Sequence, residues 1–288
     1  MPLAASELIL NSDGSIYHLN LLPEDIADTI ITVGDPDRVG DVSKYFDSIE
    51  LKKGKREFKT HTGSLNGKRI SVLSTGIGTD NIDIVLNELD ALVNIDLERR
   101  TEKEKKSILK LIRIGTSGAI QPNIAIDSFL LSETAIGLDG LMHFYNTSGK
   151  ENNQFTTSLI NHLEWESKNI TPYVFNSDME LAKVLSSNRI RFGVSVTNAG
   201  FYGPQGRSIR LSPKLSDFHH KLQTFAYQDK KITNLEMETA GIYGLASLLG
   251  HKAVSMNAIL ANRATGEFSK NPTITVDNLI QYCLEKIS

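Results

Sequence analysis

Strand-like and helix-like stretches alternate along the chain, and this alternation limits the fold more than any other feature. Residues 29–33 form a β-branched run that ends at Gly34. After it, Val39, Val42 and Phe46 recur at the spacing of one helix face. Repeated units of this kind predict an α/β fold, with a mostly parallel sheet and helices packed against it.

The rest of the chain continues the pattern. Asn66-Gly67 is a type I′ turn signal, which predicts a hairpin between the strands on either side. The charged stretch 98–106 is expected to be a solvated loop. No repeat or linker divides the sequence, so we expect one domain over residues 1–288. The predicted strands are 56–65, 69–74, 109–114, 128–135, 190–197, 232–237 and 252–261, and the further predicted helices are 79–93, 156–165, 238–249 and 276–287.

Composition excludes several classes of partner. The 288 residues carry a net charge of -3, so no overall positive field attracts nucleic acid or an anionic membrane. No run approaches the ~20 apolar residues that span a bilayer, and no signal-peptide pattern opens the sequence. The single cysteine, Cys283, cannot form an internal disulfide and fits a small apolar residue in the last helix. We therefore expect a cytoplasmic protein.

In a parallel sheet, ligands collect at the carboxyl ends of the strands, and the turn 34–38 is the first chemical feature at such an end. Gly34 would let an anion approach the backbone closely. The start of the following helix offers free N–H groups, and Arg38 can add a charged contact. The alternative is an ordinary turn with a surface arginine.

A second feature is the arginine within the apolar strand that ends near Gly115. Arg113 is costly to bury unless an anion lies beside it. That anion is either a protein carboxylate or a ligand, and this segment alone leaves both open. Thr116 and the glycines around it would also suit an oxyanion.

Two carboxylates flank a methionine at the third strand end. Glu236 and Glu238 lie on the same side of a strand, with Met237 between them. Such a pair suits a diol, because each carboxylate oxygen can accept a hydroxyl proton. The alternative is an acidic first turn that stabilises a helix N-terminus.

The loop 201–207 brings an aromatic, an amide and a guanidinium together. Gln205 both donates and accepts hydrogen bonds, whereas Arg207 only donates. This pair could bind the edge of a pyrimidine, while Phe201 packs against the base or the sugar. The alternative is a surface loop with one buried aromatic side chain.

Six segments occur in the order found in one enzyme family: 34–38, 56–58, 74–78, 113–119, 201–207 and 236–238. They resemble the hexameric-type nucleoside phosphorylases, and most closely the members that act on uridine. The resemblance covers nearly the whole chain, from about His18 onward. It implies a single-domain α/β fold with a mixed, twisted, partly barrel-like sheet flanked by helices.

The resemblance implies a phosphate site with residues from two subunits. Gly34 and Arg38 match the turn that holds phosphate, and Arg113 and Thr116 match the strand residues that complete it. Arg56 matches an arginine that a neighbouring subunit contributes. Inorganic phosphate would therefore be a co-substrate, with no other cofactor and no catalytic metal.

The resemblance also assigns the ribose site. Glu238 would be the main acceptor for the ribose diol, with Glu236 nearby and Met237 packed on the sugar. His18 matches a histidine that reaches across a dimer to the 5′-hydroxyl. We therefore expect a homo-oligomer, at least a dimer and in full a hexamer built from three dimers.

The base would be bound by Phe201, Gln205 and Arg207, with Arg263 close by. Purine-specific relatives carry an aspartate within the stretch that corresponds to 259–263, and this sequence has none there. The resemblance thus implies phosphorolysis of uridine to uracil and α-ribose 1-phosphate. The implied catalytic residues are Arg38, Arg113, Gln205, Arg207 and Arg263.

Three alternatives stay open from the sequence. They are phosphorolysis of purine nucleosides, hydrolysis by a nucleosidase of the same fold, and a nucleoside-binding protein without activity. A monovalent cation between subunits also stays open. Glu57 and Ile77 match the cation ligands of some relatives, but Asn81 stands where a serine would be.

Overall fold

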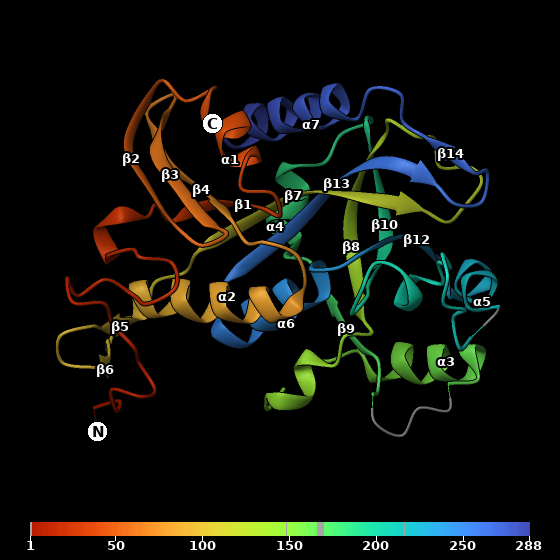
Figure 1. The fold of residues 1–288 in the computed structure, drawn as a ribbon, viewed down its shortest axis with the longest axis horizontal. Helices are drawn as coiled ribbons and strands as arrows, with labels where there is room; N and C mark the ends of the chain where they lie inside the picture. The colour runs from red at the N-terminus through yellow and green to blue at the C-terminus, as the bar shows by residue number, and fades with distance from the viewer. Residues whose placement is uncertain (1, 148, 166–169, 216) are drawn as a thin grey trace.

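The computed structural model describes residues 2–147, 149–165, 170–215 and 217–288. A 12-stranded sheet forms its core, in the order β11-β12-β10-β8-β13-β7-β1-β4-β3-β2, with β9 on β8 and β14 on β13 (Figure 1). The strands are β1 (Thr29–Val33), β2 (Ser48–Lys55), β3 (Phe58–Leu65), β4 (Lys68–Ser74), β7 (Lys110–Ala119), β8 (Phe129–Gly137), β9 (Tyr173–Asn176), β10 (Ile190–Thr197), β11 (Ala226–Tyr227), β12 (Lys230–Glu236), β13 (Lys252–Asn262) and β14 (Glu267–Phe268). A separate ladder joins β5 (Ile95–Asp96) to β6 (Thr101–Glu102).

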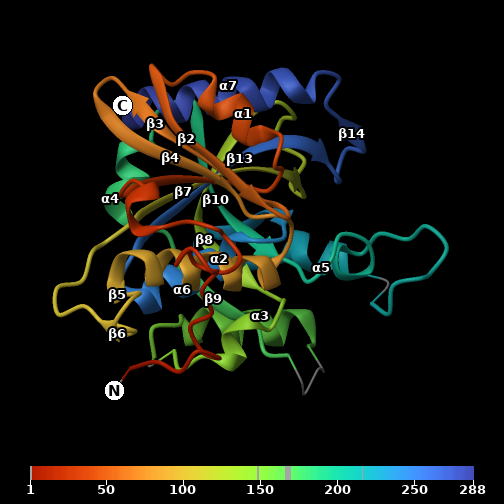
Figure 2. The ribbon, with the colours of Figure 1, turned by 60° about the vertical axis from the view of Figure 1, so that its left-hand side comes forward.

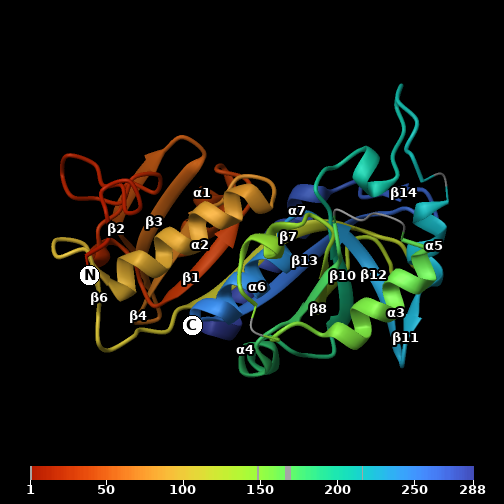
Figure 3. The ribbon, with the colours of Figure 1, turned by 90° about the horizontal axis from the view of Figure 1, so that it is seen from below.

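The helices flank this sheet. They are α1 (Arg38–Ser43), α2 (Thr79–Asn94), α3 (Asn153–Leu163), α4 (Met179–Val184), α5 (Phe218–Thr224), α6 (Thr239–Leu249) and α7 (Pro272–Ile287), with short 3₁₀ turns at Pro23–Asp25, Leu141–Phe144 and Gly203–Gln205. In Figures 1 and 3, α2 and α6 run side by side, and Figure 1 shows α7 on the opposite side of the strands. None of the helices in the described ranges has the length and hydropathy to cross a membrane.

One extra pairing turns part of the sheet into a barrel. Besides its place at the end of the β12-β10-β8-β13-β7 run, β12 also pairs with β7. Five strands therefore close on themselves, and the rest of the sheet extends from β7 through β1. The expected mixed, partly barrel-like α/β fold is confirmed.

The prediction of a mostly parallel sheet holds for the strands that carry the predicted ligand sites. β1 is parallel to β4 and β7, β13 is parallel to β7, and β10 is parallel to β8 and β12. The β2–β3–β4 hairpins and the β8–β13 pair are antiparallel. Parallel neighbours place their carboxyl ends at one edge, which is where the turn residues meet.

The periodicity of the sequence explains how the helices are held. On α2, Ile82, Val85, Leu86 and Leu89 are all buried in the cluster that also takes up α6. The opposite cluster packs α1 and α7 against the other face of the strands, and Cys283 lies buried there as a free thiol. The expected apolar role of this cysteine is therefore confirmed.

The structure adds elements that the sequence did not predict. The outer face of β2 is largely exposed, so its residues show no apolar alternation, and pairing with β3 holds the strand in place. The short elements β9, α4 and α5 were missed as well. The stretch 98–106 is a solvated loop apart from Thr101–Glu102, which forms β6.

Candidate active site

A cleft of about 1210 Å³ opens where β1, β7, β12 and β13 end. It brings together most of the residues predicted for a nucleoside site, although these residues are spread over more than 200 positions of the chain. The predicted residues that line the cleft are Gly34, Arg38, Arg113, Thr116, Phe201, Gln205, Arg207, Glu236, Met237, Glu238 and Arg263. The parallel strands β1, β7 and β13 share one edge, and closure of the barrel brings the end of β12 to it.

Arg38 supplies an uncompensated positive charge at one end of the cleft. It is the first residue of α1, and its Nη1 lies 3.5 Å from the carbonyl oxygen of Ile114. Burial, followed by repulsion from Arg113, lowers the pKa of Arg38. Within the described residues, no carboxylate lies at salt-bridge distance from it. An anion bound in the cleft would offset both the cost of burying the Arg38 charge and its repulsion from Arg113.

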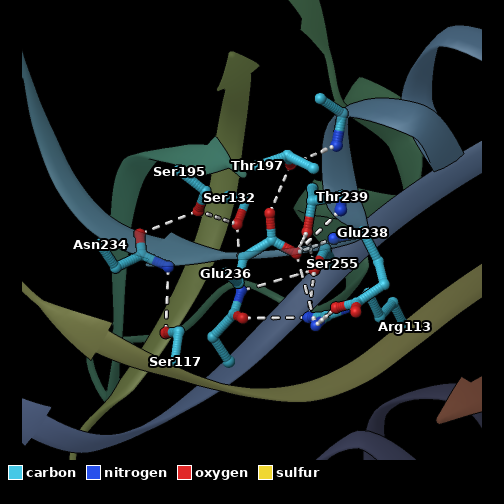
Figure 4. Close-up of polar contacts among 12 residues, drawn as sticks. Arg113, Ser117, Ser132, Ser195, Thr197, Asn234, Glu236, Glu238, Thr239 and Ser255 are labelled. Carbon is cyan, nitrogen blue, oxygen red and sulfur yellow. Dashed lines mark hydrogen bonds and ion pairs between the residues drawn. The ribbon is translucent and has the colours of Figure 1, made fainter. Parts of the chain in front are cut away.

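Arg113 is buried and has protein carboxylates beside it (Figure 4). Its Nη2 lies 2.6 Å from Glu238 Oε2 and 3.4 Å from Glu236 Oε2. Burial alone would lower the pKa of Arg113, but the charges of Glu238 and Glu236 raise it. Of the two partners that the sequence left open, the structure contains the carboxylate.

Gly115 makes this placement of the guanidinium feasible. A Cβ at Gly115 would lie only 2.0 Å from Arg113 Nη1, because the arginine folds back along its own strand. Any larger residue would push the guanidinium out of the network. The lack of a side chain at Gly115 therefore leaves the space that the Arg113 guanidinium occupies.

Glu236 accepts hydrogen bonds from the start of α6 and from Thr197. Its Oε2 accepts hydrogen bonds from the backbone N–H groups of Glu238 at 2.9 Å and Thr239 at 2.8 Å. Its Oε1 accepts from the Thr197 hydroxyl at 2.5 Å. The alternative of an acidic residue that stabilises a helix N-terminus thus describes Glu236, and Thr197 is a partner that the sequence did not indicate.

Glu238 lies between the sheet and α2. Its Oε1 accepts from the backbone N–H of Gly78 at 2.9 Å, and its Oε2 accepts from Arg113. Burial raises the pKa of Glu238, and the nearby Arg113 opposes that rise. Since each carboxylate oxygen can accept more than one hydrogen bond, Glu238 keeps acceptor capacity on the cleft side.

The other end of the cleft is built by the loop 201–207. The Arg207 guanidinium stacks 3.8 Å from the centre of the Phe201 ring and donates to the Phe201 carbonyl at 2.7 Å. It also donates to Gln205 Oε1, which leaves the amide N–H₂ of Gln205 as a donor. Arg263 donates to the carbonyl oxygen of Gln205. Burial and repulsion from Arg263 lower the pKa of Arg207 to about 10.

Comparison with known proteins identifies the family. The family model described as the phosphorylase superfamily matches residues 28–286. The chain belongs to the phosphorylase superfamily. It is therefore an enzyme of the nucleoside phosphorylase type, as expected from the resemblance.

Two curated members of the superfamily are similar over most of their length. A uridine phosphorylase of Thermococcus kodakarensis is 31% identical over 262 residues, which covers 90% of this chain and 81% of the relative. A uridine phosphorylase of Haemophilus influenzae is also 31% identical, and the match covers 90% of this chain and 91% of the relative.

Solved structures agree with this. A Trypanosoma brucei nucleoside phosphorylase, described as showing uridine phosphorylase activity, superimposes with a TM-score of 0.87 at 27% identity. That match covers 97% of this chain and 99% of the trypanosomal chain. A uridine phosphorylase of Phytophthora capsici, 21% identical with a TM-score of 0.75, shares the fold.

Arg56 and His18 do not line this cleft, in contrast to the other residues inferred from the superfamily. Arg56 is exposed in the turn before β3, and His18 Nδ1 lies 2.6 Å from Glu88 Oε1. The segments that carry them are in contact, since the Tyr17 carbonyl accepts from Lys55 Nζ at 2.6 Å and the His18 and Phe58 rings lie 6.5 Å apart. Neither residue is part of the wall of the cleft.

The three residues that matched a cation site also lie together. Glu57, Ile77 and Asn81 all line the cleft. The Asn81 amide lies 3.5 Å from the carbonyl oxygen of Ile77, so it is directed at the oxygen that a cation would need. The Asn81 N–H₂ group thus lies against the carbonyl oxygen that the match assigns to a cation.

His219 is a component of the base end that the sequence did not single out. It lies near Arg207 and Arg263, and burial followed by their positive charges lowers its pKa to about 4. Its Nε2 is buried without a hydrogen-bond partner in the described part of the chain. A histidine at the start of the short helix α5 gives no sequence signal for such a position.

Proposed function

We propose that this enzyme uses inorganic phosphate to cleave uridine into uracil and α-ribose 1-phosphate. The observation that carries the proposal is one cleft with an unpaired guanidinium at one end and an amide–guanidinium pair at the other. A carboxylate with spare acceptor capacity lies between them. The similarity to uridine phosphorylases over 90% of the chain supports the same reaction.

In this proposal, phosphate binds at the Arg38 end. Gly34, Thr116 and the start of α1 would surround the anion, and Arg38 would donate charged hydrogen bonds to it. Arg113 would contribute its charge, and also the position of Glu238, to which it is bonded. Bringing phosphate beneath the sugar converts a bimolecular attack into one between held groups.

The ribose lies between the two ends. Glu238 would accept hydrogen bonds from the sugar hydroxyls, with Met237 packed on the ring, while Glu236 keeps α6 in register. As the glycosidic bond lengthens, the sugar becomes positively charged, and the bound dianion stabilises it. Phosphate then attacks the anomeric carbon from the face opposite the base, which gives the α configuration.

The departing uracil gains negative charge on its oxygens and ring nitrogen. The Gln205 amide N–H₂, Arg207 and Arg263 would stabilise that charge, and the loop already holds them in place through their mutual hydrogen bonds. Donors aimed at developing charge accelerate a reaction more than donors that bind the substrate equally well. No other cofactor is included in the proposal.

We further propose that each cleft is completed by a second copy of the chain in a homo-oligomer, at least a dimer and in full a hexamer. Arg56 and His18 support this, because the resemblance assigns them to the site and neither lines the cleft of its own chain. The buried free thiol of Cys283 supports a reducing compartment, and we propose the cytoplasm.

Product analysis tests the proposed reaction. Purified enzyme is incubated with uridine, thymidine, inosine and adenosine, with and without phosphate, and the released bases and sugar phosphate are quantified. The proposal predicts uracil and ribose 1-phosphate in equal amounts from uridine, only with phosphate. Uracil release without phosphate would indicate a hydrolase, and release of hypoxanthine in place of uracil would indicate a purine enzyme.

A further inference from the structure

A chain of hydrogen-bonded side chains runs once around the inside of the barrel, with two residues from β7 and one from each of the other four strands (Figure 4). It begins at Arg113 on β7 and returns to β7 at Ser117. The successive contacts are Arg113 Nη1 to Asn257 Oδ1 at 3.0 Å, Asn257 Nδ2 to Ser132 Oγ at 3.0 Å, Ser132 Oγ to Ser195 Oγ at 2.5 Å, Ser195 Oγ to Asn234 Oδ1 at 2.8 Å and Asn234 Nδ2 to Ser117 Oγ at 3.0 Å.

The charge of Arg113 fixes the direction of every hydrogen bond in this chain. A guanidinium only donates, so Asn257 must turn its oxygen toward Arg113 and its N–H₂ toward Ser132. Ser132 then accepts from Asn257 and gives its own proton to Ser195. All of these side chains are buried, where an unmatched proton or lone pair is unfavourable. In the opposite direction Ser132 would accept from both Asn257 and Ser195, and its own proton would have no acceptor among the hydrogen bonds of the described residues.

The last two hydrogen bonds of the chain extend the same donor-to-acceptor order to Ser117, which lines the cleft. Ser195 donates to Asn234 Oδ1 at 2.8 Å, and the Thr233 hydroxyl lies 2.8 Å from both Asn234 Oδ1 and the carbonyl oxygen of Val194. Asn234 therefore presents its N–H₂ to Ser117, and Ser117 Oγ accepts that bond. The hydroxyl proton of Ser117 has no role left within the chain.

Ser117 lines the cleft and is 9% exposed. Gln205 and Arg207, at the base end, line the same cleft. The free proton of Ser117 is therefore available to a ligand bound in the cleft. A hydroxyl that already accepts from Asn234 serves a ligand there as a donor.

We propose that Ser117 binds the base by donating its hydroxyl proton to a carbonyl oxygen, and that the chain from Arg113 fixes it as a donor. This inference rests on the proposed function and refines its base specificity. A base with a carbonyl oxygen at this position is accepted, and one with an amino group there is disfavoured, because two donors would face each other. Asn257, Ser132, Ser195 and Asn234 act as positioning residues.

The first test removes the hydroxyl and restores it. S117A is expected to raise the KM for uridine about tenfold, as for the loss of one hydrogen bond, with a smaller change in kcat. S117T keeps a hydroxyl and is expected to recover most of the wild-type KM. Thermal unfolding of each variant checks that the fold is intact.

The second test reverses the last link without touching Ser117. In N234D, the carboxylate accepts from Ser117, so the Ser117 proton turns inward and lone pairs face the cleft. The rate with uridine relative to cytidine is expected to fall about tenfold or more. The matched control is T233V, which removes a different contact of Asn234 and leaves its N–H₂ toward Ser117, so that ratio should stay at the wild-type value.

The outcomes separate this inference from the proposed function. If the wild-type enzyme releases no uracil from uridine, the proposed function is wrong and the inference falls with it. If wild-type releases uracil while S117A keeps the wild-type KM, or N234D keeps the wild-type preference for uridine, the inference alone is overturned. A rise in KM that S117T does not reverse would also overturn it, because a lost fold contact would then be the cause.

Discussion

The two ends of the cleft are built in different ways. At the phosphate and sugar end, Arg113 in β7, Glu236 at the end of β12 and Glu238 at the start of α6 are all buried. The two carboxylates are hydrogen-bonded to the start of α6 and to the turn before α2. At the base end, an irregular loop carries the side chains, and Phe201 is 51% exposed. Figures 2 and 3 show residues 206–215 of this region projecting from the body of the molecule.

The base end also has open space on both sides. A second hollow of about 1190 Å³ adjoins the cleft, and Arg207 lines both of them. The wall between the two spaces consists of loop residues rather than a strand. A buried network of ion pairs tolerates few substitutions, whereas a loop can change with little effect on the rest of the fold. The difference indicates that ribose and phosphate chemistry resides in the scaffold and base preference in the loop.

The largest expected effect comes from Arg113. R113M would leave Glu236 and Glu238 buried without their positive partner, and we expect the free energy of unfolding to fall by about 3–5 kcal/mol. Activity should be lost as well. R207M, at the base end, should change stability by about 1 kcal/mol or less. Denaturant unfolding of both variants tests this contrast, and equal stability losses would contradict it.

The second prediction concerns Arg38, which has a charge but no carboxylate partner. R38A is expected to raise the KM for phosphate about a hundredfold, since charged hydrogen bonds to the anion are lost. Its stability should match wild-type, because no ion pair is broken. R99A is the control, since Arg99 is 83% exposed at the surface. An unchanged phosphate KM in R38A would rule out the phosphate site at this end.

A third, smaller effect is expected at the base end. Q205A removes the amide that faces the cleft, and the KM for uridine should rise about tenfold while the KM for phosphate stays constant. Q154A, an exposed substitution on α3, is the control. Steady-state kinetics with each substrate varied in turn would measure the two KM values separately. Equal increases in both KM values would mean that the two ends do not act separately.

The smallest effect is a pH dependence at the base end. The pKa of His219 falls from its ordinary value of 6.5 to about 4 through burial and the nearby Arg263 and Arg207. Between those values the unfolded chain binds the extra proton, so His219 contributes stability above pH 6.5 that is lost as the pH falls toward 4. H219Q should lose less stability than wild-type over that interval. The free energy of unfolding of both proteins is measured across this pH interval. An equal loss of stability in the two proteins would contradict the prediction.

The sequence predicted that the site residues lie together, but it predicted only some of the hydrogen bonds and ion pairs between them. Strand ends, turn glycines and polar residues are visible as patterns, and Arg38, Gln205 and Glu238 were placed by them. The partner of Arg113 stayed open, because a carboxylate 125 positions away becomes its neighbour only in the closed barrel. Ser132 and Ser195 give no signal at all, since each is one small polar residue within an apolar strand.

The elements of the fold were likewise predicted only where a local pattern marks them. Helix α2 was predicted to within a residue at its ends, because its apolar residues recur at helical spacing. Strand β2 was missed because one exposed edge strand shows no such pattern. Closure of the barrel depends on the pairing of Asn234 and Leu235 with β7, which no local pattern encodes.

A crystal structure of the enzyme with phosphate and uracil bound together would test the division of the cleft most directly. We expect phosphate within hydrogen-bond distance of Arg38 and Thr116, and uracil against Gln205 and Arg207 with a carbonyl oxygen at the Ser117 hydroxyl. Phosphate bound at Arg207, or uracil bound beside Arg38, would contradict it.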